Sequence, residues 1–129
     1  MVQIKIYGTA SFIRHSRSAI SDAIHSCVVE TLAYPQDKRI HRFFPLEPDD
    51  FIYPLGRSEK YIIIEISMFE GRTVETKKKL IRLLFSRLSE QVAIAPIDIE
   101  ITITETPKHN WGIRGTTGDE LNLNYQVQV

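Results

Sequence analysis

The chain has 129 residues, 43% of them hydrophobic, and its sixteen basic and sixteen acidic side chains give a formal net charge of zero. This length favours one domain, and a neutral chain has no overall field that would attract nucleic acid or an anionic membrane. We therefore expect neither as a partner, and any anion site must be a local cluster of cations.

The sequence contains few signals for cellular location or for a bound metal or cofactor. No run of about 18 apolar residues could cross a bilayer, and the sequence does not open on a signal-peptide pattern, so we expect a cytoplasmic protein. The single cysteine, Cys27, falls on the apolar stripe of a predicted helix, which favours a buried structural thiol. No two histidines show metal spacing with a carboxylate or cysteine, so we expect no metal and no cofactor.

The first part of the chain predicts a strand followed by a helix. Residues 1–7 alternate apolar and polar side chains, as a strand with one buried face does. Residues 8–15 are expected to form a loop, and Ser16 or Ser18 is expected to cap the helix. Pro35 ends the helical region. The predicted buried stripe of this helix is Ala19, Ile20, Ala23, Ile24, Cys27, Val28, Thr31 and Leu32.

A second strand is predicted at residues 39–44, and the next strong signal begins at residue 60. Residues 60–69 are apolar on both faces, which is typical of a central strand. Gly71 then suits a tight turn, and Thr73 can cap a following helix. The stripe of that helix is expected to consist of Leu80, Ile81, Leu84, Phe85, Leu88 and Gln91 or Val92.

The helix ends before Pro96, and isoleucines alternate with polar residues over 97–104, which predicts a last strand with one buried face. Each half of the chain thus reads strand, helix, strand, and such crossovers are nearly always right-handed. We predict an α+β fold in which tandem β-α-β repeats form a four-stranded sheet with two helices on one face.

This organisation makes residues 1–129 a single domain. The first β-α-β half covers about 1–45, and a connector follows at 46–59. Together with Pro45, which directly precedes it, the connector contains three prolines. The second half covers 60–106, and a C-terminal arm covers 107–129. The arm alternates apolar and polar residues after position 120. It is therefore expected to be a late strand or an extended arm, which could add to a neighbouring subunit's sheet.

The second face of the central strand carries Tyr61, Ile63 and Phe69 and is too apolar to leave in water. Oligomerisation is the natural way to cover it, so we expect copies of this chain to associate.

Several features together carry a family resemblance: a strand from the first residue, the β-α-β duplication, an EGR-T turn that opens the second helix, the run Asp22-Ala23-Ile24-His25, Pro35, Arg57-Ser58, Arg72 and Trp111. In order and spacing they resemble the tautomerase superfamily of 4-oxalocrotonate tautomerase-like proteins. The longer fused members, of the malonate semialdehyde decarboxylase and cis-3-chloroacrylic acid dehalogenase kind, are the most similar. The resemblance implies a homotrimer and a small carboxylate ligand.

The amino terminus departs from that family. The resemblance implies an amino-terminal proline, exposed by removal of the initiator methionine, whose secondary amine acts as general base or acid. This chain has Val2 at that position, after Met1. A primary α-amine titrates at about 8, so it is expected to be mostly protonated at neutral pH, although it could still form an imine or act as an acid.

Two further departures concern the residues that would contact a substrate. The family has a catalytic aspartate three residues beyond the proline. Here that place is taken by Lys38, with Asp37 one residue before it. The family often has two arginines before the second helix, and only Arg72 remains. A lysine would bind an anion rather than orient water.

The candidate substrate-binding residues are Arg72, Lys38, Arg39, Arg57, Trp111 and Arg114, and the doubtful catalytic position is Met1 or Val2. Arginine suits a carboxylate because its planar fork can donate two hydrogen bonds. The competing interpretation is that these cations are solvated charges or salt-bridge partners. Trp111 is either a pocket wall or a core residue, and His25 is more readily explained as a hydrogen-bonded structural histidine.

Two functions remain open from the sequence. The first is an enzyme of the tautomerase kind, an isomerase that acts on a small keto or enol carboxylate. In it Arg72, with Lys38 or Arg39, would hold the carboxylate. The second is a non-catalytic member with a residual anion pocket and a binding or structural role. Val2 favours the second, whereas Arg72 and Trp111 favour the first.

Overall fold

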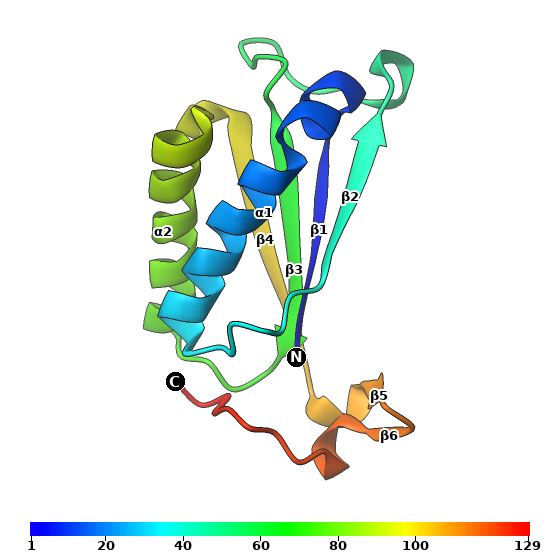
Figure 1. Ribbon diagram of the computed structural model, residues 1–129, viewed down its shortest axis with the longest axis vertical. Helices are drawn as coiled ribbons and strands as arrows, with labels where there is room; N and C mark the ends of the chain where they lie inside the picture. The colour runs from blue at the N-terminus through cyan, green and yellow to red at the C-terminus, as the bar shows by residue number, and fades with distance from the viewer.

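The computed structural model describes all 129 residues and consists of one mixed sheet with two helices packed against it (Figure 1). The strand order is β2-β1-β3-β4; β1 pairs parallel with β2 and antiparallel with β3, and β3 pairs parallel with β4. The bounds are β1 Val2–Thr9, α1 Ala10–Leu32, β2 His41–Leu46, β3 Ile62–Phe69, α2 Val74–Val92 and β4 Ile99–Thr106.

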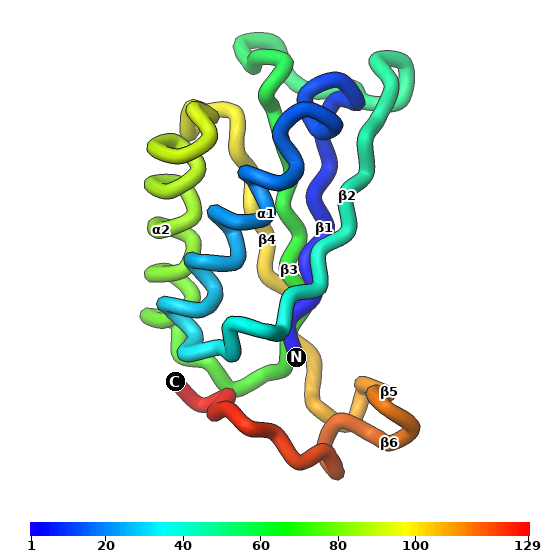
Figure 2. Tube along the Cα trace, in the orientation of Figure 1, coloured from blue at the N-terminus to red at the C-terminus, as the bar shows by residue number.

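Each half is a β-α-β unit, which confirms the predicted fold class. The halves meet where β1 runs antiparallel to β3, with Ile4 opposite Ile66 and Ile6 opposite Ile64. Both helices lie on the same face of the sheet (Figures 1 and 2). Neither combines the length and the apolar composition that a bilayer-spanning segment requires.

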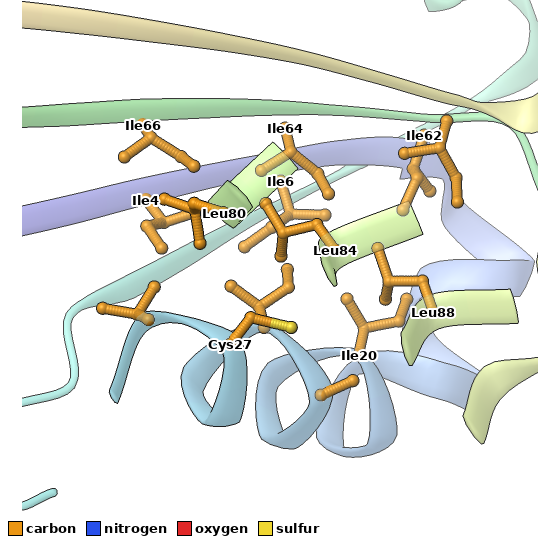
Figure 3. Close-up of a cluster of buried hydrophobic side chains, with 14 of the residues drawn as sticks. Ile4, Ile6, Ile20, Cys27, Ile62, Ile64, Ile66, Leu80, Leu84 and Leu88 are labelled. Atoms are coloured by element: carbon orange, nitrogen blue, oxygen red, sulfur yellow. The ribbon is translucent and has the colours of Figure 1, made fainter. Parts of the chain in front are cut away.

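The core lies between that face and the helices. Ile4, Ile64 and Ile66 point toward Leu80 and Leu84 from α2, as Figure 3 shows, and all five are at most 1% exposed. Cys27 packs in the same core from α1, and burial raises the pKa of its thiol to about 11. Cys27 is therefore a buried structural thiol, as the sequence predicted.

The prediction for the start of α1 was wrong. The helix begins at Ala10, directly after Thr9, rather than at Ser16 or Ser18. Ile13 is fully buried and lies one turn before the predicted start, so the apolar stripe extends further back than the polar residues around it suggested. Ala19, expected in the stripe, is exposed.

The last strand also begins later than predicted. Pro96–Asp98 forms a 3₁₀ turn, and Ile97 in it is 56% exposed, so β4 starts only at Ile99. The proline at the first position of the turn fixes its backbone in a helical conformation and interrupts the alternation. The predicted cap of α2 is confirmed, because the Thr73 hydroxyl accepts a hydrogen bond from the Thr76 amide at 3.1 Å.

The second face of the sheet is less exposed than the sequence suggested. Tyr61 is buried because it stacks with Phe51 and Tyr53 of the connector, at ring-centroid distances of 5.7 and 5.0 Å. Phe69 is buried at the other end of β3, where Trp111 packs edge-on at 5.2 Å. Of the three residues that predicted an exposed apolar face, only Ile63 remains partly exposed.

The C-terminal arm forms no late strand. A small hairpin, β5 Gly112–Ile113 with β6 Thr116–Thr117, is followed by an irregular segment that passes beneath the end of the sheet where the chain begins (Figure 2). Its backbone pairs with its own chain, because Thr73 donates to the carbonyl oxygen of Val129 at 3.1 Å. Of the two alternatives that the sequence offered, a late strand and an extended arm, the structure has the extended arm.

Candidate functional site

The site lies where β1 begins and β3 ends. Val2 is opposite Met68 in the register, so the amino terminus lies next to Phe69 and the turn that leads into α2. The C-terminal arm closes this end from below (Figure 1). Two segments that are distant in sequence, the end of β3 with the turn that follows it and the C-terminal arm, therefore border the first two residues.

Two tyrosine hydroxyls hold the amino-terminal nitrogens. The α-amine of Met1 donates to the hydroxyl of Tyr125 from the arm, and the Val2 amide donates to the hydroxyl of Tyr34 at 3.2 Å. The two rings meet edge to face, with centroids 4.8 Å apart. Met1 is only 8% exposed, so the amine lies in a largely dry environment.

Arg72 enters the same region from the turn before α2. Gly71 has a φ of 134°, a conformation that a residue with a Cβ resists, and this turn directs Arg72 inward. The Arg72 side chain donates from Nη1 to the Phe69 carbonyl oxygen at 3.3 Å. The residue is only 5% exposed, yet its Nε and Nη2 have no partner. A buried cation left without an anion is costly, so these nitrogens are suited to receive one.

Two lysines add to the positive charge. Lys38 Nζ lies 5.1 Å from the centroid of the Tyr125 ring, and Lys108 Nζ lies 6.0 Å from that of Phe69. Neither forms a salt bridge. Asp37, the alternative to Lys38, is exposed and also unpaired. Of these two residues, Lys38, the one three positions after Pro35, is therefore the one that lies beside the site.

These charges change the chemistry of the amine. Burial, together with Arg72, Lys38 and Lys108, lowers the pKa of the Met1 amine to about 4. The amine is therefore neutral at pH 7, in contrast to the expectation of a mostly protonated group. Burial also lowers the pKa of Arg72 and raises the pKa of both Tyr34 and Tyr125. The site thus combines an uncharged nucleophile or base with undissociated hydroxyls and a guanidinium.

Trp111 borders the site and is also a packing residue. It contacts Phe69, and its indole nitrogen donates to the Thr106 hydroxyl at 2.7 Å. The tryptophan, Met1 and Val127 belong to the same small apolar cluster beneath the arm. Trp111 is thus compatible with both interpretations from the sequence, a pocket wall and a core residue, because it packs on Phe69 in the apolar cluster that also contains Met1.

The other predicted cations do not gather here. Arg39 is paired with Asp22 at 2.7 Å on the side of α1. Arg57 lies over the Tyr61 ring at 6.0 Å, and Tyr61 precedes β3 whereas Arg72 follows it, so the two arginines are at opposite ends of the sheet. Arg114 is exposed at the tip of the small hairpin, near enough to Tyr125 only for a long-range influence on its pKa.

The histidines are placed by structural hydrogen bonds. His25 donates from Nε2 to the carbonyl oxygen of Gln36 at 2.8 Å, which fits the structural role expected of it. His41 Nδ1 lies 2.7 Å from the Ser21 hydroxyl, and burial lowers the pKa of its ring to about 4. No group of three or more His, Cys, Asp or Glu side chains is arranged to hold a metal.

Three cavities differ in what they could bind. One of about 340 Å³ adjoins the site, lined by Lys108, Tyr125, Val127 and neighbouring residues of the arm. A larger one of about 420 Å³ lies beside the connector, and Glu59 is its only charged lining residue. A third, of about 360 Å³, is lined by Arg17, Asp22 and Arg39, and there Asp22 already pairs with Arg39. The cavity next to the amine is the one whose only charged lining residue is a cation, Lys108, so an anion matches it best.

Sequence reasoning missed Tyr34, Tyr125 and Lys108. Tyr34 directly precedes Pro35, but nothing in the local pattern gives the direction of its side chain. Tyr125 contacts the amine across 124 positions of sequence, and a contact of that separation leaves no periodic signal. Lys108 lies in a 3₁₀ turn after β4 whose place in space depends on the whole second half.

Comparison with known proteins places these features among relatives. A family sequence model described as tautomerase enzyme matches residues 38–114. The 2-hydroxymuconate tautomerase of Comamonas testosteroni is 39% identical over 57 residues, which are 44% of this chain and 90% of that protein. Probable tautomerase YusQ of Bacillus subtilis (strain 168) is 25% identical over 97 residues, 71% of this chain and 76% of its own.

Solved structures are similar to this chain over most of its length. The FG41 malonate semialdehyde decarboxylase inhibited by 3-bromopropiolate superposes with a TM-score of 0.76 and is 34% identical, covering 85% of this chain and 87% of its own. Native fused 4-OT superposes with a TM-score of 0.79 at 19% identity, covering 92% of this chain and 98% of its own, which shows a shared fold alone.

Proposed function

The chain belongs to the tautomerase family, and from this premise we propose that it binds and converts a small keto or enol carboxylate at the pocket around its amino terminus. Relatives support the chemical class: one is a 2-hydroxymuconate tautomerase, and another is a malonate semialdehyde decarboxylase inhibited by 3-bromopropiolate.

The observation that carries the proposal is the unpaired Arg72. Its guanidinium is buried, Nε and Nη2 lack partners, and the neutral amine belongs to the same site. A carboxylate could receive two hydrogen bonds from these nitrogens and would compensate the buried charge. The reacting carbon of a small oxo acid would then lie close to the amine, with Lys38 and Lys108 adding to the attraction.

Each residue has a distinct role in this proposal. Arg72 holds the carboxylate, with Lys38 and Lys108 nearby, and Trp111 supports the pocket floor. The primary amine, of Met1 or of Val2 after methionine removal, moves the proton. Arg39 and Arg57 take no part, because one is paired and the other lies at the far end of β3.

A non-catalytic binding protein is the second candidate, and one observation favours it. With Met1 in place, the Val2 nitrogen is an amide that already donates to Tyr34 at 3.2 Å, so it has no basic lone pair at that position. The pocket would then bind an anion without turning it over.

We also propose a homotrimer. Fused 4-OT neighbours have been solved as symmetric and asymmetric trimers, and they superpose on this chain with TM-scores of 0.72 to 0.76. The half-buried stretch around Ile63 on the second sheet face is the surface such an assembly would cover.

The test measures ketonisation of phenylenolpyruvate by the unmodified protein, Val2→Pro, Arg72→Ala and both together, after mass spectrometry has established the native amino terminus. Arg39→Ala is the matched control. The enzyme proposal predicts activity that Arg72→Ala abolishes and Arg39→Ala preserves. Activity that appears only with Val2→Pro, and still needs Arg72, would indicate a binding protein with a competent pocket. If no substitution changes the rate from the uncatalysed value, the enzyme proposal fails.

A further inference from the structure

We propose that the amino-terminal amine is a covalent nucleophile that forms an imine with the carbonyl carbon of a small 2-oxo carboxylate, while Arg72 holds the carboxylate. This inference rests on the function proposed above and adds a covalent step to it. It follows from the kind of amine the chain has and from the groups around it.

The amine is primary whichever residue carries it. The chain begins Met1-Val2, and either residue at the amino terminus has two exchangeable protons on nitrogen. Both nitrogens already donate to a tyrosine hydroxyl, Met1 to Tyr125 and Val2 to Tyr34. Loss of the methionine would therefore move the amine by one residue within the same pocket and leave it beside a hydroxyl that can relay protons.

The surrounding charge favours a neutral product. Arg72, Lys38 and Lys108 all act against a positive charge on the amine, and no carboxylate pairs with Lys38 or Lys108. The C=N product of a secondary amine and a ketone is always a charged iminium. A primary amine can give an uncharged imine, which a desolvated cationic pocket tolerates better.

The step balances without any other reactant. The nitrogen lone pair forms a bond to the carbonyl carbon, and the carbonyl π electrons move to oxygen, which takes one amine proton to give a carbinolamine. The carbon–oxygen bond then breaks as the nitrogen lone pair forms the C=N bond. The oxygen leaves as water with the second amine proton, and the hydroxyls of Tyr125 and Tyr34 are placed to pass these protons on.

A cavity of about 340 Å³ lies beside the amine: Tyr125, whose hydroxyl accepts the hydrogen bond from the Met1 amine, lines it together with Lys108, although Met1 and Arg72 themselves do not. That volume exceeds the needs of a three-carbon oxo acid. In the proposed complex the carboxylate accepts hydrogen bonds from Nε and Nη2 of Arg72, the two nitrogens that have no partner in the chain.

Reductive trapping tests the inference. The full chain is incubated with pyruvate and sodium cyanoborohydride, and the adduct is mapped by peptide mass spectrometry. We expect one adduct on the amino-terminal peptide and a rate about 30-fold lower in Arg72→Gln, because a charge-assisted carboxylate contact is lost. Arg39→Gln should label as the unmodified protein does. Acetone, which lacks the carboxylate, should label the unmodified protein and Arg72→Gln equally slowly.

The pH profile gives a second readout. A free Met-Val-Gln peptide amine, with a pKa of about 8, should label roughly 50-fold more slowly at pH 6 than at pH 8 from loss of its neutral form. In the protein the amine stays neutral over this range, because its pKa is lowered to about 4, so the labelling rate relative to the peptide should rise as pH falls.

Four results would overturn the inference. Labelling confined to lysine side chains would do so, as would a protein profile that follows the peptide. Calorimetry that shows Arg72-dependent pyruvate binding without any amino-terminal adduct would reject the imine and leave the proposed function standing. Absence of both binding and adduct would reject the two together.

Discussion

The sequence made both Arg72 and Arg39 candidates for binding the same carboxylate, but in the structure one is buried and the other is exposed. Arg72 is 5% exposed and has two nitrogens without partners. Arg39 is exposed in the segment between α1 and β2, and Asp22 of α1 lies 2.7 Å from its guanidinium. A buried guanidinium without a counter-ion, rather than the charge alone, is therefore what makes Arg72 the stronger candidate for a binding residue.

Ligand affinity should separate the two arginines most strongly. Arg72→Met removes the only buried cation of the pocket and should weaken binding of a small oxo carboxylate by about 30- to 1,000-fold. Arg39→Met breaks an exposed ion pair and should change affinity by less than about twofold. Isothermal calorimetry with pyruvate checks both variants, and equal losses in the two would contradict the distinction.

The turn that orients Arg72 can be broken next. Gly71 has a φ of 134°, and a Cβ there would lie 2.9 Å from Val127 of the arm. Gly71→Ala should therefore lower the free energy of unfolding by about 2–3 kcal/mol, through backbone strain and displacement of the arm.

The matched control is Gly56→Ala. Gly56 also has a positive φ of 87°, but no atom lies within 4 Å of its added Cβ. Only the strain of about 1 kcal/mol is expected there. Urea denaturation measures both, and limited proteolysis of the arm should accelerate in the Gly71 variant alone. A similar loss in both variants would mean that the arm does not pack on the turn.

Stability should respond in the opposite direction from binding at Arg72. Replacing a buried, unpaired cation with an apolar side chain of similar length should raise the free energy of unfolding by about 1–3 kcal/mol, so Arg72→Met should be more stable than the parent. Arg39→Met should differ from the parent by less than about 1 kcal/mol. Thermal denaturation would contradict this interpretation if Arg72→Met unfolded at a lower temperature than Arg39→Met.

The two regions should also have different pH windows. His41 interacts electrostatically with Arg39 and Asp22, and its pKa falls from 6.5 to about 4, whereas that of the Met1 amine falls from 8.0 to about 4. In both cases the unfolded chain binds more protons inside the window, so stability is complete above the unfolded pKa and decreases as pH falls toward 4.

His41→Gln should therefore remove part of the acid sensitivity, about 1 kcal/mol, between pH 6.5 and pH 4. The loss of stability from pH 8 to pH 6.5 belongs to the amine and should persist in this variant. Urea denaturation across these pH values checks the assignment. A flat profile above pH 6.5 in the parent protein would contradict a depressed amine pKa.

Periodicity predicted most of the fold because each half buries its side chains in a regular pattern. Ile62, Ile64 and Ile66 alternate, and Leu80, Leu84 and Leu88 recur every fourth residue, so strand and helix could be distinguished. The start of α1 was missed because Arg14, His15 and Arg17 surround Ile13 and obscure the stripe. Ile97 was misplaced because alternation continues through a turn that Pro96 begins.

The site could be predicted only in its local part. Gly71, Arg72 and Thr73 are adjacent, and their turn and cap could be recognised from the sequence. The contacts of Tyr34 and Tyr125 with the amino terminus depend on how three distant segments meet, which no local spacing encodes. The pairing of Arg39 with Asp22 joins α1 to the segment before β2, so the sequence could not show that this cation is already neutralised.

The central claim is that the amino terminus and Arg72 form one anion pocket, and a crystal structure with bound pyruvate tests it most directly. The account predicts the carboxylate on Nε and Nη2 of Arg72, with the carbonyl carbon within bonding or contact distance of the terminal nitrogen. Pyruvate bound instead at Arg39 or Arg57, with Arg72 still unpaired, would contradict it.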